Sequence, residues 1–166
     1  LGLNPDSFEP GDDNFFQENI RIISGLYGLL RPFDMIQAYR LEMGSKLLNT
    51  RGKNLYEFWG TTLSDELEDT LKSHNHKTIV NLASDEYFKA INTKTLKPNV
   101  VTPKFYEIRG DNKKMISFFA KKARGAMARF IVSEKIIDPK EIRAFNLDGY
   151  NFLKSESDEY TFVYVR

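Results

Sequence analysis

The sequence contains no cysteine among its 166 residues. This absence excludes disulfides, thiol catalysis, iron–sulfur ligation and cysteine zinc sites within the chain. No apolar run approaches the roughly 20 residues that a membrane-spanning helix needs, and no signal peptide is visible. We therefore expect a cytoplasmic protein that has no membrane partner.

An excess of charge of one sign is also missing, because 24 Lys and Arg residues stand against 23 Asp and Glu residues. The net charge therefore indicates no class of partner, and an argument for nucleic acid must rest on local clusters of Lys and Arg. The apolar content of 41%, with 13 Phe and 8 Tyr, argues against a disordered chain. Because 166 residues can bury a substantial core, we predict a single domain over residues 1–166.

The patterns of common catalytic classes are absent as well. The chain has no GxSxG, HExxH, Walker A or GxGxxG motif, so it predicts no reaction. The two histidines, His74 and His76, lie in a hydrophilic turn, and we predict no metal site and no cofactor. The chain begins Leu1-Gly2-Leu3 without Met. We therefore expect a fragment of a longer protein, whose remainder holds further functional residues.

Apolar periodicity and turn residues predict a mixed order of helices and strands, and hence an α+β (mixed α/β) fold with a mixed or antiparallel sheet flanked by helices. The predicted helices are roughly 13–23, Leu55 to about Ser73, a turn at Asp85–Lys89 capped by Ser84, Ala120–Ile131, and a short helix from Asp138. The predicted extended segments are 38–47, Lys77–Ala83, Val100–Ile108, Lys114–Phe119, Gly149–Phe152 and Tyr160–Val165. Pro103 favours an edge position or a bulge for the third of these segments.

Two glycines, Gly25 and Gly28, bracket Leu26-Tyr27 in the most distinctive stretch of the chain. This spacing indicates a tight hairpin whose backbone takes positive φ or is closely approached by a partner. A helix leading into such a hairpin is similar to the first half of a helix-hairpin-helix, in which backbone N–H groups bind a DNA phosphate. We expect such an element near residues 13–40, with a plain turn as the alternative.

A basic helix is the second distinctive stretch. Its cations lie off the predicted apolar stripe, beside the small residues Gly125, Ala126 and Ala128, and they are Lys121, Lys122, Arg124 and Arg129. Cations beside small residues would let a phosphate backbone approach closely, which gives binding that is independent of sequence. The alternative is a solvated helix face whose small residues pack on a neighbouring element.

Four charged residues allow an enzyme as the alternative function. Arg40 and Glu42 point to the same side if the backbone is extended, and they would form an anion clamp or a structural salt bridge. Asp85 and Glu86 follow a buried strand, where sites of α/β sheets often lie, although ordinary helix-start chemistry also explains them. Converging with the basic helix on one cleft, these side chains would act on a nucleotide, a nucleic-acid base or another anionic substrate.

Six segments occur in a characteristic order: SGLYGLLRPFD, YRLEMG, YEFWG, NLASDEYFK, SFFAKKARGAMARFI and FNLDGYNF, starting at Ser24, Tyr39, Tyr56, Asn81, Ser117 and Phe145. Together they resemble the bacterial YaaA family of peroxide-stress proteins, long regarded as a family of unknown function. The resemblance covers nearly the whole chain from Phe15 onward, and it implies a further N-terminal portion of roughly a third of the protein.

The resemblance implies a cytoplasmic protein that protects cells during hydrogen peroxide stress and is linked to low intracellular free iron. It also implies a positively charged cleft, a helix-hairpin-helix element and binding to double-stranded DNA. Carried over by position, the DNA- or anion-binding residues would be Gly25, Gly28, Arg31, Arg40, Lys121, Lys122, Arg124 and Arg129. We expect the glycine hairpin and the basic helix to share one concave face, and the sequence indicates no oligomeric state.

Overall fold

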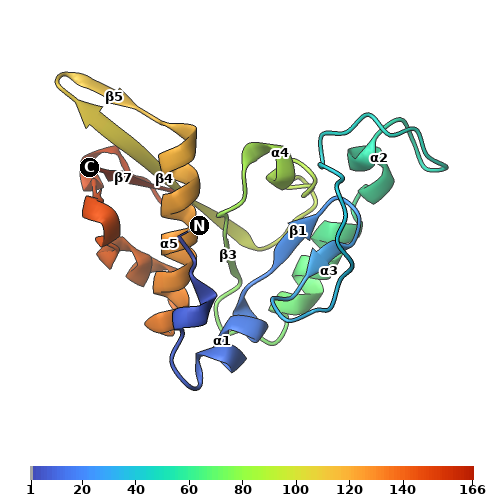
Figure 1. Cartoon of the computed structure of the whole chain (residues 1–166), viewed down its shortest axis with the longest axis horizontal. Coiled ribbons are helices and arrows are strands. Elements are labelled where there is room, and N and C mark those ends of the chain that lie inside the picture. The colour runs from blue at the N-terminus through green and yellow to red at the C-terminus, as the bar shows by residue number, and fades with distance from the viewer. Residues whose placement is uncertain (1) are drawn as a thin grey trace. The chain divides into compact units, whose positions relative to one another are not determined.

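The computed structural model describes residues 2–166, which form two compact units (Figure 1). Unit 1 comprises the chain up to Phe15 together with Asn75–Leu82 and Asn99–Arg166. Unit 2 comprises Phe16–His74 and Ala83–Pro98. Helices and strands are mixed along the chain, which confirms the predicted α+β class.

Unit 1 is built on a mixed sheet. Its path runs β3-β4-β7-β6, with β5 paired to β4 off this path. The strands are β3 (Thr78–Val80), β4 (Asn99–Arg109), β5 (Asn112–Lys114), β6 (Asn151–Phe152) and β7 (Thr161–Val165). β4 runs parallel to β3 and β7, whereas β5 pairs antiparallel with β4 and β6 pairs antiparallel with β7. The predicted closing hairpin is therefore present as β6 and β7.

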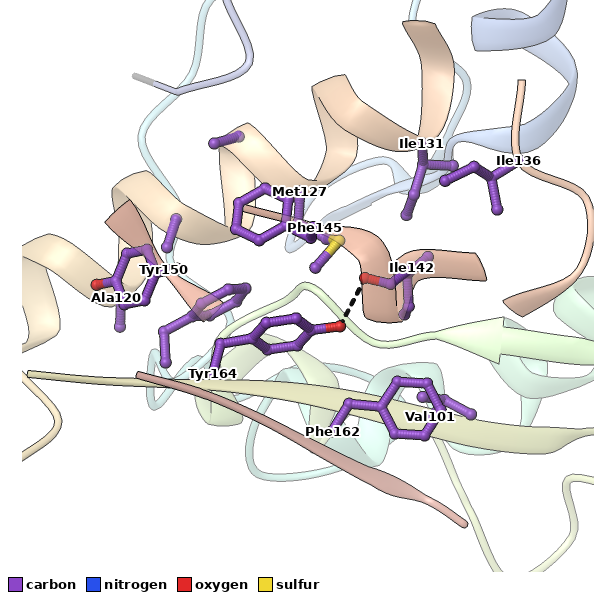
Figure 2. Packing of buried hydrophobic residues seen from close by; sticks show 13 residues of the cluster. Val101, Ala120, Met127, Ile131, Ile136, Ile142, Phe145, Tyr150, Phe162 and Tyr164 are labelled. Atoms are coloured by element: carbon purple, nitrogen blue, oxygen red, sulfur yellow. Dashed lines mark hydrogen bonds between the residues drawn. The ribbon is translucent and has the colours of Figure 1, made fainter. Parts of the chain in front are cut away.

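The core of unit 1 lies between this sheet and the helix α5 (Ser117–Ser133). The predicted apolar stripe is confirmed, since four of its members are buried, Ala120, Ala123, Met127 and Ile131, and the fifth, Phe130, is half-buried. Figure 2 shows the core around α5 together with the aromatic side chains that the strands contribute, among which Tyr164 is fully buried. Its hydroxyl donates to the Ile142 carbonyl oxygen at 2.8 Å, so the core contains a polar group without losing a hydrogen bond.

The predicted edge position of Pro103 is correct only locally, because β4 is a central strand of the sheet but has β7 alone as its partner at this residue. The Thr102 N–H donates to the Tyr160 carbonyl of the β7 side at 2.7 Å. Successive backbone groups alternate in direction, so the nitrogen of Pro103 points to the other side of β4. The β3 ladder has already ended there, at Val101. A central proline therefore costs no ladder hydrogen bond at this register.

The boundary between β5 and α5 also differs from the prediction. β5 ends at Lys114, and the residues Ser117, Phe118 and Phe119 form the first turn of α5 rather than the end of a strand. Phe118 is 60% exposed, so it lies on the solvent side of this first turn. Helical backbone hydrogen bonding begins at once, with the Ala120 N–H bonded to the Ile116 carbonyl at 2.9 Å.

Unit 2 carries a small β-hairpin and short helices. Its elements are β1 (Ile22–Ser24), β2 (Gly28–Leu30), α2 (Leu55–Trp59), α3 (Thr62–Leu71) and α4 (Asp85–Phe88). The preceding helix α1 (Asp12–Asn19) contains the boundary between the units and ends before the predicted residue 23, because Ile22 and Ile23 enter the antiparallel ladder with Leu30 and Leu29. The predicted helix from Leu55 is split at Gly60, which has φ +51°.

Between Leu30 and Leu55 the described chain has no helix and no strand longer than an isolated bridge. The helix expected after the glycine hairpin is therefore absent, and the element is a helix followed by a β-hairpin rather than a helix-hairpin-helix. The stretch 38–47, predicted to be extended, pairs with no strand.

Short 3-10 helices complete the chain: η1 (Pro5–Ser7), η2 (Pro139–Ala144), η3 (Leu147–Gly149) and η4 (Lys154–Glu156). The predicted helix start at Asp138 and the predicted cap at Ser84 are both confirmed. The Asp138 side chain accepts from the Lys140 N–H at the start of η2, and the Ser84 hydroxyl accepts from the Tyr87 N–H at the start of α4. Within residues 2–166, every helix is too short or too polar to cross a membrane.

Candidate functional site

The glycines of the hairpin are required by close packing within unit 2. Gly28 has φ +79°, and a Cβ atom there would lie 2.8 Å from the Trp59 ring. A Cβ atom on Gly25 would lie 2.9 Å from the Leu41 carbonyl oxygen. The Trp59 indole also donates to the Gly25 carbonyl at 3.1 Å. Both glycines are buried, so their observed role is to let other parts of unit 2 approach the hairpin.

The N–H groups at the tip of this hairpin already have an acceptor. Those of Leu26 and Tyr27 donate to the buried Ser24 hydroxyl at 3.3 and 2.9 Å. Ser24 Oγ is in turn 2.5 Å from the Tyr39 hydroxyl. A phosphate would have to displace Ser24 to use these two N–H groups. Binding of DNA by the hairpin backbone therefore stays a prediction. The Ser24 hydroxyl would compete with a phosphate for the N–H groups at the tip.

The segment Tyr39–Gly44, which we call the strap, is fastened to unit 2 at both ends. The Tyr39 ring packs edge-on against Tyr27 at 5.4 Å, and the Gly44 N–H donates to Glu86 Oε1 at 2.8 Å. Met43 anchors the strap with 0% exposure, while Arg40 and Glu42 are exposed. Within the described residues no ion pair joins Arg40 to Glu42, so the structural salt bridge is not formed, and the anion clamp stays a prediction.

The candidate acids have different surroundings. Glu86 and Glu42 lie near Tyr87, whose pKa is raised first by burial and then by the negative charge of these carboxylates. Asp85 is exposed in the first turn of α4, where the helix dipole favours an acid. The structure thus brings two of the three predicted acids together. In residues 2–166 no group of three or more His, Asp or Glu side chains is placed to hold a metal ion.

Arg31 is paired within its own turn. Its Nε and Nη2 atoms lie 3.0 and 2.9 Å from Asp34 Oδ1, and its backbone N–H donates to Asp34 Oδ2 at 2.8 Å. The hydrogen bonds from the Arg31 backbone and side chain lower the pKa of the Asp34 carboxyl. Arg31 is therefore a turn-stabilising residue that stays accessible, with 58% of its side chain exposed.

The four cations of α5 differ in their exposure and in their hydrogen-bond and ion-pair partners. Lys121 is exposed and has no ion pair among the described residues. Lys122 Nζ lies 3.2 Å from both oxygens of Asp148. Arg129 donates to the Asn4 carbonyl at 3.1 Å and to the Ser7 hydroxyl, and Arg124 is half-buried.

The small residues of α5 are where another segment packs. Gly2, at φ +77°, sits so close that a Cβ atom there would lie 2.2 Å from the Lys122 carbonyl and 2.9 Å from the Ala126 nitrogen. The alternative interpretation of the small residues is therefore correct at Gly125 and Ala126, since they make room for protein rather than for phosphate. The glycine hairpin belongs to unit 2 and α5 to unit 1, and a shared face stays a prediction.

A feature that the sequence interpretation missed is the extent of the basic stretch. From Asn112 to Ser133 the chain has no Asp or Glu, and this stretch covers β5 and all of α5. Its cations are Lys113, Lys114, Lys121, Lys122, Arg124 and Arg129. A window of charge that ignores predicted element boundaries would have found it. Lys114 and Lys121 are both exposed and lack an ion pair in the described chain.

Comparison with known proteins gives the family. A family model described as "Peroxide stress protein YaaA" matches residues 1–156. The chain belongs to this YaaA family. Curated relatives named "UPF0246 protein" are 48% identical over 99% of the chain in Aliivibrio fischeri, 52% over 92% in Chromobacterium violaceum and 47% over 99% in Neisseria meningitidis. The chain spans 64%, 59% and 64% of these YaaA-family relatives.

Proposed function

We propose that this YaaA-family protein acts in the cytoplasm during peroxide stress by binding double-stranded DNA through its phosphate backbone, without reading base sequence. The observation that carries the proposal is the acid-free stretch Asn112–Ser133, whose six cations lie on one hairpin strand and the helix after it. Such a stretch attracts a polyanion, and it contains no carboxylate that would repel the polyanion.

Lys114 and Lys121 are the first phosphate contacts in this proposal. Both are exposed and have no competing ion pair among the described residues, so a phosphate gains their full charge. Lys113 and Lys122 are held by Glu156 and Asp148, which reduces what they offer a phosphate. The family description supports the link to peroxide stress. Neutralised phosphates release counterions, so affinity should fall steeply as salt rises.

Fluorescence anisotropy with a labelled duplex of about 20 base pairs tests the proposal across a salt series. We expect the double variant Lys114→Glu/Lys121→Glu to bind at least about tenfold more weakly, with a salt slope shallower by about 2, since each phosphate contact contributes about 0.9.

The matched control is Lys46→Glu/Lys94→Glu, which makes the same change of charge at two exposed lysines of unit 2. This control should stay within about twofold of the unmodified protein at the same salt concentration. Binding that does not respond to salt, or an equal loss in both double variants, would show that the acid-free stretch is not the DNA contact.

A further inference from the structure

A cavity of about 360 Å³ lies in unit 1, separate from Lys114 and Lys121. Three segments that are distant in sequence line it: the start of the described chain at Gly2 and Asn4, the helix α5, and η3 with Leu147 and Asp148. This volume is at the lower end of the range for small-molecule sites.

The helix α5 supplies two cations on one face of the cavity. Lys122, Ala126 and Arg129 all line it, at spacings of four and three residues along the helix. Such residues lie on one side of a helix, and seven residues correspond to a rise of about 10 Å. Lys122 and Arg129 both reach this cavity, so an anionic group inside it meets a cation on either side.

Arg129 is fixed in position before any ligand arrives. Its guanidinium bonds the Asn4 carbonyl, the Ser7 hydroxyl and the Ser7 carbonyl, and it lies over the Phe8 ring at 5.6 Å. These contacts use three of the five N–H donors of an arginine, which leaves two for a ligand. An arginine that is already ordered loses little entropy when it binds an anion.

Asp148 adds an acceptor to the same cavity. It has φ +55°, and its carboxylate holds Lys122 through both oxygens. Only three non-glycine residues in the described chain have positive φ, and two of them, Asn4 and Asp148, line this cavity. Asn and Asp are the side-chain-bearing residues that adopt this conformation most readily, so the backbone holds both at the cavity without needing glycine. A carboxylate repels phosphate and accepts from a hydroxyl group, so it selects the part of a ligand next to the phosphate.

We propose that this cavity binds a phosphate monoester carried by a sugar. Lys122 and Arg129 hold the phosphate between them, and Asp148 accepts a hydrogen bond from a sugar hydroxyl. Two cations and one carboxylate give the lining a net charge that suits the dianionic phosphate. The same chemistry occurs in a free sugar phosphate and at the 5′-phosphorylated end of a DNA strand.

Titration of the protein with ribose 5-phosphate and with inorganic phosphate, followed by calorimetry or ³¹P NMR, tests this site. We expect ribose 5-phosphate to bind at least about fivefold more tightly, because only it satisfies Asp148. Lys122→Gln should weaken binding at least about tenfold, since it removes a charge-assisted contact. Lys140→Gln, at an exposed lysine of unit 1 outside the cavity, should stay within about twofold.

Asp148→Asn keeps a residue that tolerates positive φ and removes the carboxylate charge. This variant should bind inorganic phosphate at least as well as the unmodified protein but lose its preference for ribose 5-phosphate. Absence of saturable binding of ribose 5-phosphate to the unmodified protein, or equal losses in Lys122→Gln and Lys140→Gln, would overturn the proposal.

Duplexes with and without a 5′-phosphate identify the source of the ligand. A preference of about fivefold or more for the phosphorylated duplex assigns the site to DNA ends, and equal affinity assigns it to a free sugar phosphate. The unphosphorylated duplex reports on backbone binding alone. If ribose 5-phosphate does not bind but the unphosphorylated duplex still binds in a salt-dependent way, only this inference is rejected. If ribose 5-phosphate binds but that duplex does not, only the proposed DNA function is rejected.

Discussion

Among single residues, Gly28 meets a backbone requirement and a packing requirement together. Its φ of +79° disfavours any side chain, and the Trp59 ring fills the space that a Cβ atom would need. Gly110 has the backbone requirement alone, at φ +58°, since no atom lies within 4 Å of the position that a Cβ atom would take. A comparison of substitutions at Gly28 and Gly110 therefore separates the cost of backbone strain from the cost of overpacking.

We predict that Gly28→Ala destabilises the protein by about 2–4 kcal/mol, because it adds overpacking to backbone strain. Gly110→Ala should cost only about 1 kcal/mol. Urea denaturation of both variants measures the difference. Equal losses would mean that Trp59 moves aside freely.

Glu107 is a buried carboxylate whose charge is retained. Burial alone would raise the pKa of its carboxyl, but hydrogen bonds from Tyr150 at 2.6 Å and Arg166 at 2.8 Å outweigh it, and the net pKa is lowered. A carboxyl with a lowered pKa in the folded state stabilises the fold above its unfolded pKa of about 4.3. This stabilisation is lost as the pH falls through the folded pKa.

We predict that Glu107→Gln lowers the free energy of unfolding by about 2 kcal/mol at pH 7, where the ion pair and hydrogen bonds are intact. The difference between the variant and the unmodified protein should shrink as the pH falls below about 4. Urea unfolding at several pH values measures it. A difference that is constant with pH would show that the charge of Glu107 contributes nothing.

The methionines differ sharply in exposure, which matters for a chain without cysteine. Met35 is 99% and Met115 49% exposed, whereas Met43 and Met127 are 0% exposed. We predict that mild hydrogen peroxide converts Met35 and Met115 to the sulfoxide first, because oxidation requires access to the sulfur. Peptide mass spectrometry over time measures each site. Oxidation of Met127 at the rate of Met35 in folded protein would contradict the buried core.

Among the helices and strands, α2 begins with a reciprocal cap. The Asn54 side chain accepts from the Glu57 N–H at 2.9 Å, and the Glu57 carboxylate accepts from the Lys53 N–H at 2.8 Å. The first bond satisfies an N–H group that a helix start leaves without a partner, and the second holds the residue before the cap.

We predict that Asn54→Ala costs about 1 kcal/mol of stability, and that Asn54→Gly costs only a few tenths, since glycine is itself a favourable capping residue. Thermal denaturation followed by circular dichroism compares the two. A glycine variant as unstable as the alanine variant would place the role of Asn54 in packing rather than in capping.

For the molecule as a whole, the division into two units bears on the predicted single domain. The chain passes between the units four times, at Phe15, His74, Leu82 and Pro98, and α1 itself contains the first crossing. Neither unit is a continuous piece of sequence, so neither can unfold without constraining segments of the other.

We therefore predict one cooperative unfolding transition. The only tryptophan, Trp59, reports on unit 2, and the long helix α5 dominates the ellipticity of unit 1. Fluorescence and ellipticity should give the same midpoint in urea, as two-state unfolding requires. Separate midpoints would show two independently stable units and would make the single-domain prediction wrong.

Features that depend on neighbours along the chain could be predicted from the amino-acid order alone. Periodicity located the buried stripe of α5, and helix-start residues located the beginnings of η2 and α4. Six ordered segments indicated the YaaA family, which the family model confirms. These signals are local, because residues that lie close together in the sequence determine helix faces, caps and family motifs.

Features that depend on residues far apart in sequence required the folded chain. The sequence places Arg129 among the cations available to phosphate, whereas contacts across the fold to Asn4 and Ser7 hold it. Gly25 is needed because the strap lies against it, and Pro103 sits in a central strand because β3 ends before it. Long-range packing fixes which charges stay exposed, and no local pattern contains that information.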